Sequence, residues 1–174
     1  MTDNSALRIT PFHPQYLDGV SALIVSIQRG EYGIPITFKQ QPDLHDIAGF
    51  YQCGAGQFWV ALDNHSVIGT IALRDLGDGS AALRKMFVAA AYRGQRHGTA
   101  KALLETLLTH ARRVEIRTIY LGTTEKFIAA HRFYEKHGFE LVTSGCLPAS
   151  FPRMKVDSRF YRITLSKPAQ LSKN

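Results

Sequence analysis

In the first third of the chain, the apolar residues recur first at every second position and then at helical spacing. Residues 7–11 alternate and end at a proline, which is typical of a half-buried strand. From Leu17 to Ile27 the apolar positions recur at helical spacing. Residues 30–41 show no clear period and predict a loop. Pro42 then begins a second predicted helix, whose buried stripe runs from Leu44 to Tyr51.

The middle of the chain predicts three consecutive strands followed by a further helix and strand. The three strands lie at 58–62, 67–73 and 82–88, and turn-forming residues connect them, so we expect an antiparallel meander. A helix with a continuous apolar stripe at 98–113 leads to the next strand, at 118–122. Such a βαβ unit places its two strands side by side and parallel. A helix at 127–137 and strands at 139–143 and 160–165 complete the order βααβββαβαββ, which predicts a single α/β domain over residues 1–174.

The composition is that of a globular domain large enough to fold around one core. The chain has 174 residues, of which 45% are hydrophobic and 20% are charged, and a domain of this length buries roughly 70% of the surface of its unfolded chain. The longest apolar run, Met86–Ala91, has six residues, whereas a membrane-spanning helix needs about 20. Residues 1–5 carry no basic segment leading into an apolar stretch, so no secretory signal is predicted. We therefore expect a cytoplasmic protein that has no membrane partner.

The cysteines and histidines predict neither a disulfide framework nor a metal site. Cys53 and Cys146 are too few for a framework, and neither has a second cysteine at metal-binding spacing. We expect two buried free thiols. The sequence contains no His-x-His or His-Glu-x-x-His arrangement, so no metal is expected.

The positive charge is concentrated in one window. The formal net charge is +7, and residues 84–136 contain eleven Lys or Arg against four Glu, while the rest of the chain is balanced. Neither terminus carries a run of charge, which disfavours a general nucleic-acid binder. The confined surplus favours an anionic ligand held by one half of the domain, and basic residues on solvated helix faces are the alternative.

The most informative segment is 92–101, with the sequence YRGQRHGTAK, between a predicted strand and the long helix. Its glycines let a ligand approach the backbone, and the first N–H groups of a helix have no partner within that helix. Arg93, Arg96 and Lys101 add positive charge, so the segment predicts a site for phosphate oxygens. The glycine spacing fits neither a P-loop nor a dinucleotide fingerprint. A basic turn with a helix-starting glycine and no ligand is the alternative.

Two blocks of residues carry a resemblance to a known family. Gln95-x-x-Gly98-x-Ala100, followed by two leucines, is similar to the Q/R-x-x-G-x-G/A signature of the GNAT superfamily of acyl-coenzyme A (CoA) dependent N-acyltransferases. The run AHRFYEKHGF at 130–139 resembles that family's A-x-x-F-Y-E-K-x-G-F helix and turn. The predicted element order extends the resemblance over nearly the whole chain. The segment 147–157 and the residues at 160–161 resemble the tail of some uncharacterised bacterial members, in which this segment would border the acceptor pocket.

The resemblance implies a fold and a way of binding acetyl-CoA, the expected cosubstrate. The fold is a mixed seven-stranded sheet whose fourth and fifth strands, here 83–88 and 118–122, are parallel and splay around coenzyme A. Phe87 and Val88 would pair their main-chain groups with the pantetheine amides. The diphosphate would lie on the amides of 96–101. The implied cofactor-binding residues are Phe87, Val88, Arg93, Gln95, Arg96, His97, Gly98, Thr99, Ala100 and Lys101.

The same resemblance implies that Tyr134 is catalytic. A phenol within hydrogen-bond reach can give a proton to the thiolate that leaves when an amine attacks the thioester. Because Phe127, Ala130 and Tyr134 share one helical face, a core aromatic is the alternative. We predict that Tyr134→Phe keeps the affinity for acetyl-CoA and lowers turnover at least about tenfold.

Two positions depart from the family pattern. Many relatives carry Asn where this chain has Phe127, and Arg84 and Lys85 occupy the part of the fourth strand where some relatives place a general base. The weaker candidates for a base are therefore Glu31, Asp43 and Asp46, for which capping or solvated roles are the alternatives.

The sequence thus predicts an N-acetyltransferase that moves an acetyl group from acetyl-CoA to a primary amine of a small molecule by direct attack. Two alternatives are a protein acetyltransferase acting on a lysine or N-terminal amine, and a non-catalytic acyl-CoA sensor. A nucleic-acid module is disfavoured by the confined charge, so no nucleic-acid partner is expected. The C-terminal strand is expected at an edge of the sheet, where a second copy can pair to form a homodimer.

Overall fold

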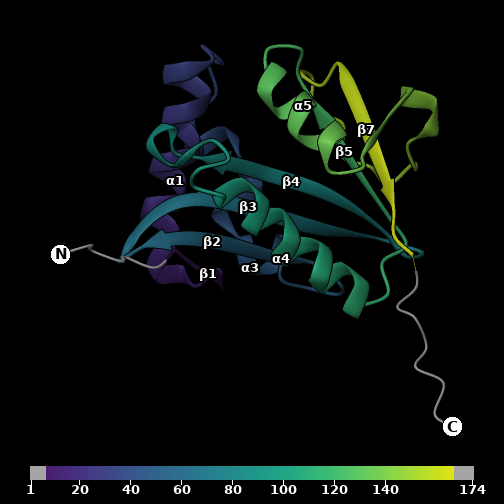
Figure 1. The fold of residues 1–174 in the computed structure, drawn as a ribbon, viewed down its shortest axis with the longest axis horizontal. Helices are drawn as coiled ribbons and strands as arrows, with labels where there is room; N and C mark the ends of the chain where they lie inside the picture. The colour runs from purple at the N-terminus through teal and green to yellow at the C-terminus, as the bar shows by residue number, and fades with distance from the viewer. Residues whose placement is uncertain (1–6, 167–174) are drawn as a thin grey trace, which may run out of the picture. The chain divides into compact units, whose positions relative to one another are not determined.

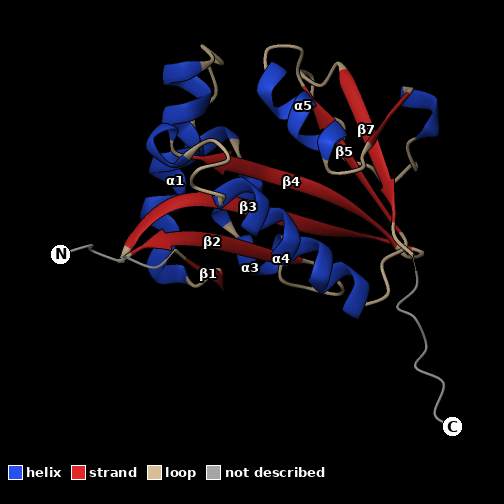
Figure 2. Ribbon diagram, in the orientation of Figure 1, coloured by secondary structure: helices blue, strands red, loops and turns tan. Residues whose placement is uncertain are grey.

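The computed structural model describes residues 7–166, which form an α/β fold with a mixed seven-stranded sheet (Figures 1 and 2). The strand order is β1-β2-β3-β4-β5-β7-β6. The strands are β1 (Arg8–Pro11), β2 (Gln57–Asp63), β3 (Ser66–Gly77), β4 (Ser80–Val88), β5 (Thr118–Thr123), β6 (Glu140–Val142) and β7 (Arg159–Thr164). The α-helices are α1 (Leu17–Val25), α2 (Pro42–His45), α3 (Ile47–Phe50), α4 (Thr99–Arg113) and α5 (Ile128–Lys136). Short 3-10 or π turns are η1 (Pro14–Tyr16), η2 (Ser26–Glu31), η3 (Phe38–Gln40), η4 (Ala90–Tyr92) and η5 (Ser144–Cys146).

The described chain divides into two compact units. Unit 1 comprises residues 7–74 and 83–108, and unit 2 comprises residues 75–82 and 109–166. Unit 1 therefore holds β1, β2, α1 to α3 and the turn before α4, whereas unit 2 holds β5 to β7 and α5. A single domain over the whole chain stays a prediction.

The alternation of apolar residues in β2 explains how unit 1 builds its core. Phe58, Val60 and Leu62 belong to a buried cluster that includes Val20 and Ile24 of α1. The opposite face of β2 and β3 packs against α4, which lies in front of these strands in Figure 1. There, a Cβ atom on Gly69 of β3 would lie 3.0 Å from a methyl group of Leu103, so the glycine permits close packing of helix on strand.

In unit 2 the first residues of β4 pair in parallel with β5, as the βαβ pattern predicts. Ser80, Ala81 and Ala82 are in register with Thr118, Ile119 and Tyr120. The register ends at Ala82, although β4 continues to Val88 in unit 1 and β5 continues to Thr123. The remaining strands of unit 2 are antiparallel, since β7 pairs with β5 on one side and with β6 on the other. The prediction that the C-terminal strand lies at an edge of the sheet was therefore wrong, because β6 covers the free side of β7. The splaying of β4 and β5 around a ligand stays a prediction.

The helix predicted from Pro42 is two short helices, so the prediction of one continuous helix was wrong. The backbone leaves the helical region at Asp46 (φ −143°, ψ 68°), between α2 and α3. The Asp46 carboxylate accepts a hydrogen bond from the N–H of Gly49 (2.9 Å) and thereby caps α3. The break keeps Leu44, Ile47 and Tyr51 buried, which is why the apolar pattern does not reveal it. The predicted loop at 30–41 likewise contains the end of η2 and the whole of η3.

Both cysteines are free, but the prediction that they are buried was wrong. Cys53 and Cys146 are exposed in short turns between elements. Residues 7–166 hold no group of three or more His, Cys, Asp or Glu side chains placed to bind a metal ion. None of the helices in that range has the length and apolar character needed to cross a membrane.

Candidate functional site

The turn between β4 and α4 leaves its main chain open. Just after Val88, the N–H of Ala89 donates to the carbonyl of Ile68 (2.8 Å), which ties the start of the turn to β3. Gly94 and Gly98 have φ angles of +95° and +65°, and a Cβ atom on either would meet no atom within 4 Å. The two glycines therefore supply the left-handed backbone of the turn and leave room for a ligand against the main chain.

The first turn of α4 offers main-chain donors. Among residues 7–166, the N–H groups of Thr99, Ala100 and Lys101 have no hydrogen-bond acceptor, and the bond from Ala102 to the carbonyl of Gly98 (2.9 Å) is the first of the helix. The first turn holds no acidic side chain that would compete for these donors. Because α4 has 15 residues, the positive end of its dipole adds to them. A helix start of this kind binds phosphate oxygens.

Exposed polar and cationic side chains surround these donors. Gln95, Arg96 and His97 are exposed. The ammonium of Lys101 lies 3.8 Å from Glu105, one helical turn further on, in an exposed pair that holds it only weakly. Unit 1 thus brings these predicted cofactor-binding residues together in one segment.

Tyr92 anchors the turn to the end of β2. Its hydroxyl donates to Oδ2 of Asp63, and this hydrogen bond raises the pKa of Tyr92. The contact links residues that are far apart in the sequence and limits the movement of the turn.

Arg93 is bound by protein groups on two edges of its guanidinium. Nη1 and Nη2 donate to the two carboxylate oxygens of Glu31 (2.8 and 2.6 Å), and Nε donates to the carbonyl of Val88 (2.8 Å). The hydrogen bond from Arg93 lowers the pKa of Glu31. A carboxylate with a lowered pKa accepts a proton less readily, which disfavours the predicted role of Glu31 as a general base. The geometry instead makes Glu31 a support for Arg93.

The two residues at the end of β4 have different surroundings. Phe87 packs against the apolar cluster of unit 1, and Val88 is buried. The Val88 carbonyl already accepts the bond from Arg93, so a pantetheine amide would have to use its second lone pair. The pairing of these residues with pantetheine stays a prediction.

In unit 2, α5 holds Tyr134 among aromatic rings. The side chain is 5% exposed, and the ring centroids of Phe133, Phe139 and Tyr161 lie 5.7, 5.4 and 6.1 Å away. Burial raises the pKa of the Tyr134 phenol, which keeps it in the proton-carrying form.

The Tyr134 hydroxyl has no hydrogen-bond partner within the described chain. The phenol is therefore a buried group that forms no hydrogen bond with a described residue.

Glu135, which follows Tyr134 on α5, binds the helix to β7. The Tyr161 hydroxyl donates to Oε1 of Glu135 (2.8 Å), and Arg159 donates to both of them. These bonds hold the helix turn that carries Tyr134.

The start of α5 is closed by its own main chain. The N–H of Phe127 donates to the carbonyl of Thr124 (3.1 Å), and the Phe127 carbonyl accepts from the N–H of His131 (3.1 Å). Nε2 of His131 also lies 3.0 Å from the Thr124 carbonyl. No side-chain hydrogen bond caps the helix at Phe127.

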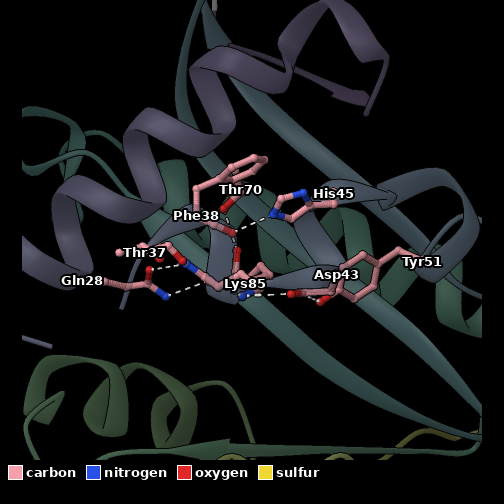
Figure 3. A network of polar contacts seen from close by, with 9 residues as sticks. Gln28, Thr37, Phe38, Asp43, His45, Tyr51, Thr70 and Lys85 are labelled. Carbon is pink, nitrogen blue, oxygen red and sulfur yellow. Dashed lines mark hydrogen bonds and ion pairs between the residues drawn. The ribbon is translucent and has the colours of Figure 1, made fainter. Parts of the chain in front are cut away.

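A buried polar network in unit 1 is centred on Lys85 (Figure 3). The Lys85 ammonium donates to the side-chain oxygen of Gln41 (2.7 Å) and lies 3.3 Å from Oδ2 of Asp43. The same carboxylate oxygen accepts a 2.5 Å bond from the hydroxyl of Tyr51, while Gln28 exchanges two hydrogen bonds with Gln41. Desolvation lowers the pKa of Lys85, and the neighbouring Asp43 opposes this shift.

A comparison with family models decides which family the chain belongs to. The model described as "Acetyltransferase (GNAT) family" matches residues 23–139, more than half of the chain, and this range includes both the turn before α4 and α5. This chain is a member of the GNAT acetyltransferase family. Acetyl-CoA is the acyl donor of that family, and the open first turn of α4 fits its diphosphate.

Two bacterial GNAT acetyltransferases of known structure are similar over nearly the whole chain. The first, from Staphylococcus aureus Mu50, is 40% identical with a TM-score of 0.88, and the alignment covers 92% of this chain and 100% of that one. The second, an acetyltransferase from Streptococcus agalactiae 2603, is 34% identical with a TM-score of 0.86, and the alignment covers 91% and 98%. The GNAT fold that the resemblance implied is thereby confirmed.

A curated relative is similar to this chain over only part of its own length. The N-acetylaspartate synthetase of Xenopus tropicalis is 41% identical over 102 residues, which are 58% of this chain and 37% of that protein. The GNAT domain described here thus corresponds to little more than a third of that synthetase.

The carboxylates predicted as weak candidates for the base of this GNAT domain all have other partners. Glu31 binds Arg93, and Asp43 binds both Lys85 and Tyr51. Asp46 caps α3. Their geometry therefore favours the structural roles that the sequence left as alternatives.

Sequence reasoning missed the role of Lys85 in the GNAT domain. Its partners Gln41 and Asp43 lie at the residue before α2 and in α2, and Gln41 is 44 positions earlier in the chain, so no local spacing reveals them. The available signal was the pair Arg84-Lys85 in a strand that is otherwise apolar from Ala81 to Val88.

Proposed function

We propose that this GNAT domain is an acetyl-CoA-dependent N-acetyltransferase that acetylates the primary amine of a small molecule by direct attack. The observation that carries the proposal is the open first turn of α4, where Thr99, Ala100 and Lys101 present three N–H groups without acceptors among residues 7–166. Such donors suit the diphosphate of acetyl-CoA. The glycines of the same turn leave the approach clear.

The positive charge of the turn helps to bind acetyl-CoA and takes no part in the chemical steps. Arg96 and Lys101 add long-range attraction for an anion, whereas Arg93 is held by Glu31 and shapes the turn. In this proposal the main-chain groups of Phe87 and Val88 pair with the pantetheine arm, as a strand added to a sheet would.

Tyr134 is the proposed proton donor. The amine nitrogen attacks the thioester carbon with its lone pair, a C–N bond forms, and the C–S bond breaks. The sulfur takes the proton of the Tyr134 hydroxyl, so that free coenzyme A leaves as a thiol. Burial raises the pKa of Tyr134, so the phenol carries its proton before each cycle.

The amine must also lose a proton before or during the attack. Glu31, Asp43 and Asp46 are engaged with other groups, so we assign this proton to solvent water rather than to one of them. The tyrosinate left after transfer regains a proton from the same solvent.

A small acceptor is supported by the curated relative named N-acetylaspartate synthetase. The product in that name is an acetylated amino acid, which is a small molecule. A protein acceptor and a non-catalytic acyl-CoA sensor are the competing proposals. The sensor is favoured by one position, since Phe127 stands where many relatives carry Asn.

The proposal is tested by thermal shift with acetyl-CoA, followed by release of free thiol with a panel of amines. Acetyl-CoA at about 100 times its dissociation constant should stabilise the fold by about 2.7 kcal/mol. Thiol release with small amines would support the proposal. Thiol release only with peptides or proteins would show that the acceptor is a protein amine. Stabilisation by acetyl-CoA without thiol release in the presence of any amine would favour the sensor.

A further inference from the structure

Lys85 has a backbone conformation that is unusual within a strand. Among residues 7–166, four residues other than glycine have a positive φ, and three of them lie in turns between elements, at Asn64, Asp78 and Glu115. Lys85, with a φ of +52°, lies inside β4. A lysine at positive φ is strained, and it keeps this conformation only where the surrounding structure holds it. Strain of this kind is often retained at functional sites.

The main chain and the side chain of Lys85 are both held. Its carbonyl accepts a 2.6 Å hydrogen bond from the hydroxyl of Thr70, which is fully buried in β3. Its ammonium donates to the side-chain oxygen of Gln41 (2.7 Å) and lies 3.3 Å from Oδ2 of Asp43 (Figure 3). The side chains of Lys85 and Asp43 are 6% and 8% exposed, so little water competes for these contacts.

The partners of the Lys85 ammonium are fixed in turn. Gln41 exchanges two hydrogen bonds with Gln28 of η2 (3.2 and 2.9 Å), and both side chains are buried. Oδ2 of Asp43 also accepts the bond from the hydroxyl of Tyr51. Loss of the ammonium would leave buried oxygen atoms with fewer donors, which is unfavourable. The network is therefore a fixed anchor on one side and reaches β4 through Lys85 on the other.

In the proposed function the thioester lies close to this part of β4. The diphosphate binds at the first turn of α4, and the pantetheine arm pairs with Phe87 and Val88. Acetyl-CoA therefore runs back along β4, and its thioester, beyond the pantetheine amides, lies next to the residues that precede Phe87. Lys85 is two positions before Phe87, roughly 7 Å along a strand. A displacement of about 1 Å near reacting atoms can lower turnover about a hundredfold.

We infer that Lys85 is a positioning residue for the transfer: its ammonium, anchored by Asp43 and Gln41, holds β4 in the conformation that presents the thioester to the amine. Lys85 acts through the main chain of β4 and is not itself a proton donor or acceptor in the reaction. The inference rests on the proposed function and adds a residue on which turnover depends. Because the diphosphate binds at α4, affinity for acetyl-CoA should depend on Lys85 far less than turnover does.

The experiment breaks the Lys85–Asp43 pair from both sides, with Lys85→Met, Asp43→Asn and the double variant. Methionine keeps an unbranched side chain without the charge, and asparagine keeps an oxygen that can accept the bond from Tyr51. The double variant removes both charges together, so no buried charge is left unpaired. It should therefore fold even where a single variant does not.

Two further variants separate the side chain from the backbone and from charge in general. Lys85→Gly removes the side chain and relieves the strain, because glycine adopts positive φ readily. Lys39→Met is the matched control, since Lys39 is an exposed lysine of η3 in the same unit. Thiol release gives kcat and KM, and calorimetry gives the dissociation constant of acetyl-CoA. Hydrogen exchange of the ligand-free protein, followed by mass spectrometry, reports on residues 83–91.

Lys85→Met and Asp43→Asn should each lower kcat about tenfold or more, while the dissociation constant of acetyl-CoA stays within about threefold. If the two side chains act as one unit, the double variant should lose about as much as either single variant rather than the product of the two losses. Lys85→Gly should lose kcat as Lys85→Met does, although its backbone is relieved. Exchange of residues 83–91 should be faster in the Lys85 variants and unchanged in Lys39→Met.

Three results would overturn the inference. A kcat within about twofold of the unchanged protein in the double variant or in Lys85→Gly would show that turnover does not need the Lys85 side chain. Equal losses of kcat and of acetyl-CoA affinity would leave Lys85 with a general structural role. Losses that multiply in the double variant would mean that the two side chains act separately.

Hydrogen exchange keeps the inference distinct from the proposed function. If the unchanged protein releases no thiol with any amine, the proposed function fails, and exchange then decides on the anchoring of β4 by itself. Faster exchange of residues 83–91 in Lys85→Met, but not in Lys39→Met, would support that anchoring. Equal exchange in both variants would overturn it.

Discussion

The two helices that follow β4 and β5 begin in opposite ways. Before α4, Gly98 adopts a positive φ and three N–H groups of the next turn find no acceptor among residues 7–166. Before α5, the N–H of Phe127 is bonded to Thr124, and the ring of His131 contacts the same carbonyl. One start is open to an anion, whereas the other is closed and oriented by contacts within the protein.

In the proposed function, the two helix starts have different roles. The α4 turn uses fixed main-chain dipoles, which bind without changing protonation state. The α5 helix buries a phenol whose raised pKa keeps it protonated, and its proposed role is to give that proton to the leaving sulfur. Substitutions in the first should therefore change affinity for acetyl-CoA, and those in the second should change turnover.

The largest expected effect is on the α5 side. Tyr134→Phe removes one oxygen from a ring that stays packed against Phe139, so the fold should persist. Turnover should fall at least about tenfold, and up to about a hundredfold, because the proton donor to the thiolate is lost. Steady-state release of thiol measures kcat, and titration of acetyl-CoA should give an unchanged dissociation constant.

Tyr16→Phe is the matched control, because it removes the hydroxyl of a half-buried tyrosine in η1 of unit 1. Its turnover should equal that of the unchanged protein. A normal kcat in Tyr134→Phe would remove this residue from the mechanism and leave it as a core aromatic.

The next effect is on the α4 side. Gly98→Ala places a methyl group at a positive φ, where the strain is about 1 kcal/mol and the new atom faces the space left for the diphosphate. We expect the dissociation constant of acetyl-CoA to rise about tenfold, with little change in kcat at saturation. Isothermal titration calorimetry measures the first quantity.

Gly77→Ala provides the control for strain alone. Gly77 has a φ of +81° and open space around its Cβ position, but it belongs to the turn between β3 and β4. Both variants should lose similar thermal stability, and only Gly98→Ala should lose affinity. Equal affinity losses would show that the α4 turn is not the diphosphate site.

The contrast between the two helix starts also explains how much the sequence predicted. The open turn depends on neighbouring residues, because glycine at Gly98 and the unpaired N–H groups after it follow from local geometry. The open conformation of that turn was therefore predictable from the sequence. The break at Asp46 was not, since the apolar spacing of Leu44, Ile47 and Tyr51 also fits one unbroken helix.

Contacts between distant segments are what the sequence could not predict. Lys85 depends on Asp43 and Gln41, and Arg93 depends on Glu31, 62 positions earlier in the chain. Glu31 was predicted as a weak candidate for the base because the fourth strand offers Arg84 and Lys85 in place of a carboxylate, and its bond with the distant Arg93 could not be foreseen. The exposed positions of Cys53 and Cys146 were missed for a related reason, as burial depends on the packing of the whole unit.

A smaller effect tests the role of Glu31 directly. Glu31→Gln removes the ion pair with Arg93 but keeps a side chain of the same shape. We expect KM for acetyl-CoA to rise about two- to fivefold with kcat unchanged, because a partly exposed pair contributes less than about 1 kcal/mol. A loss of kcat of about a hundredfold would instead restore Glu31 as the general base. Glu105→Gln, which breaks the exposed pair with Lys101, is the control and should change KM less.

The smallest effect is the pH dependence of that same ion pair. The hydrogen bond from Arg93 lowers the pKa of Glu31 in the folded protein below its ordinary value of 4.5. The stabilisation is therefore complete above the unfolded pKa and is lost as the pH falls through the lower, folded value. At neutral pH the unchanged protein should melt about 1–2 °C above Glu31→Gln, given about 0.5 kcal/mol for a partly exposed pair. Melting curves of both proteins between pH 7 and pH 3 should converge at the acid end, because the glutamine cannot titrate. A difference that stays constant over this range would mean that the hydrogen bonds of Glu31, rather than its charge, support the turn before α4.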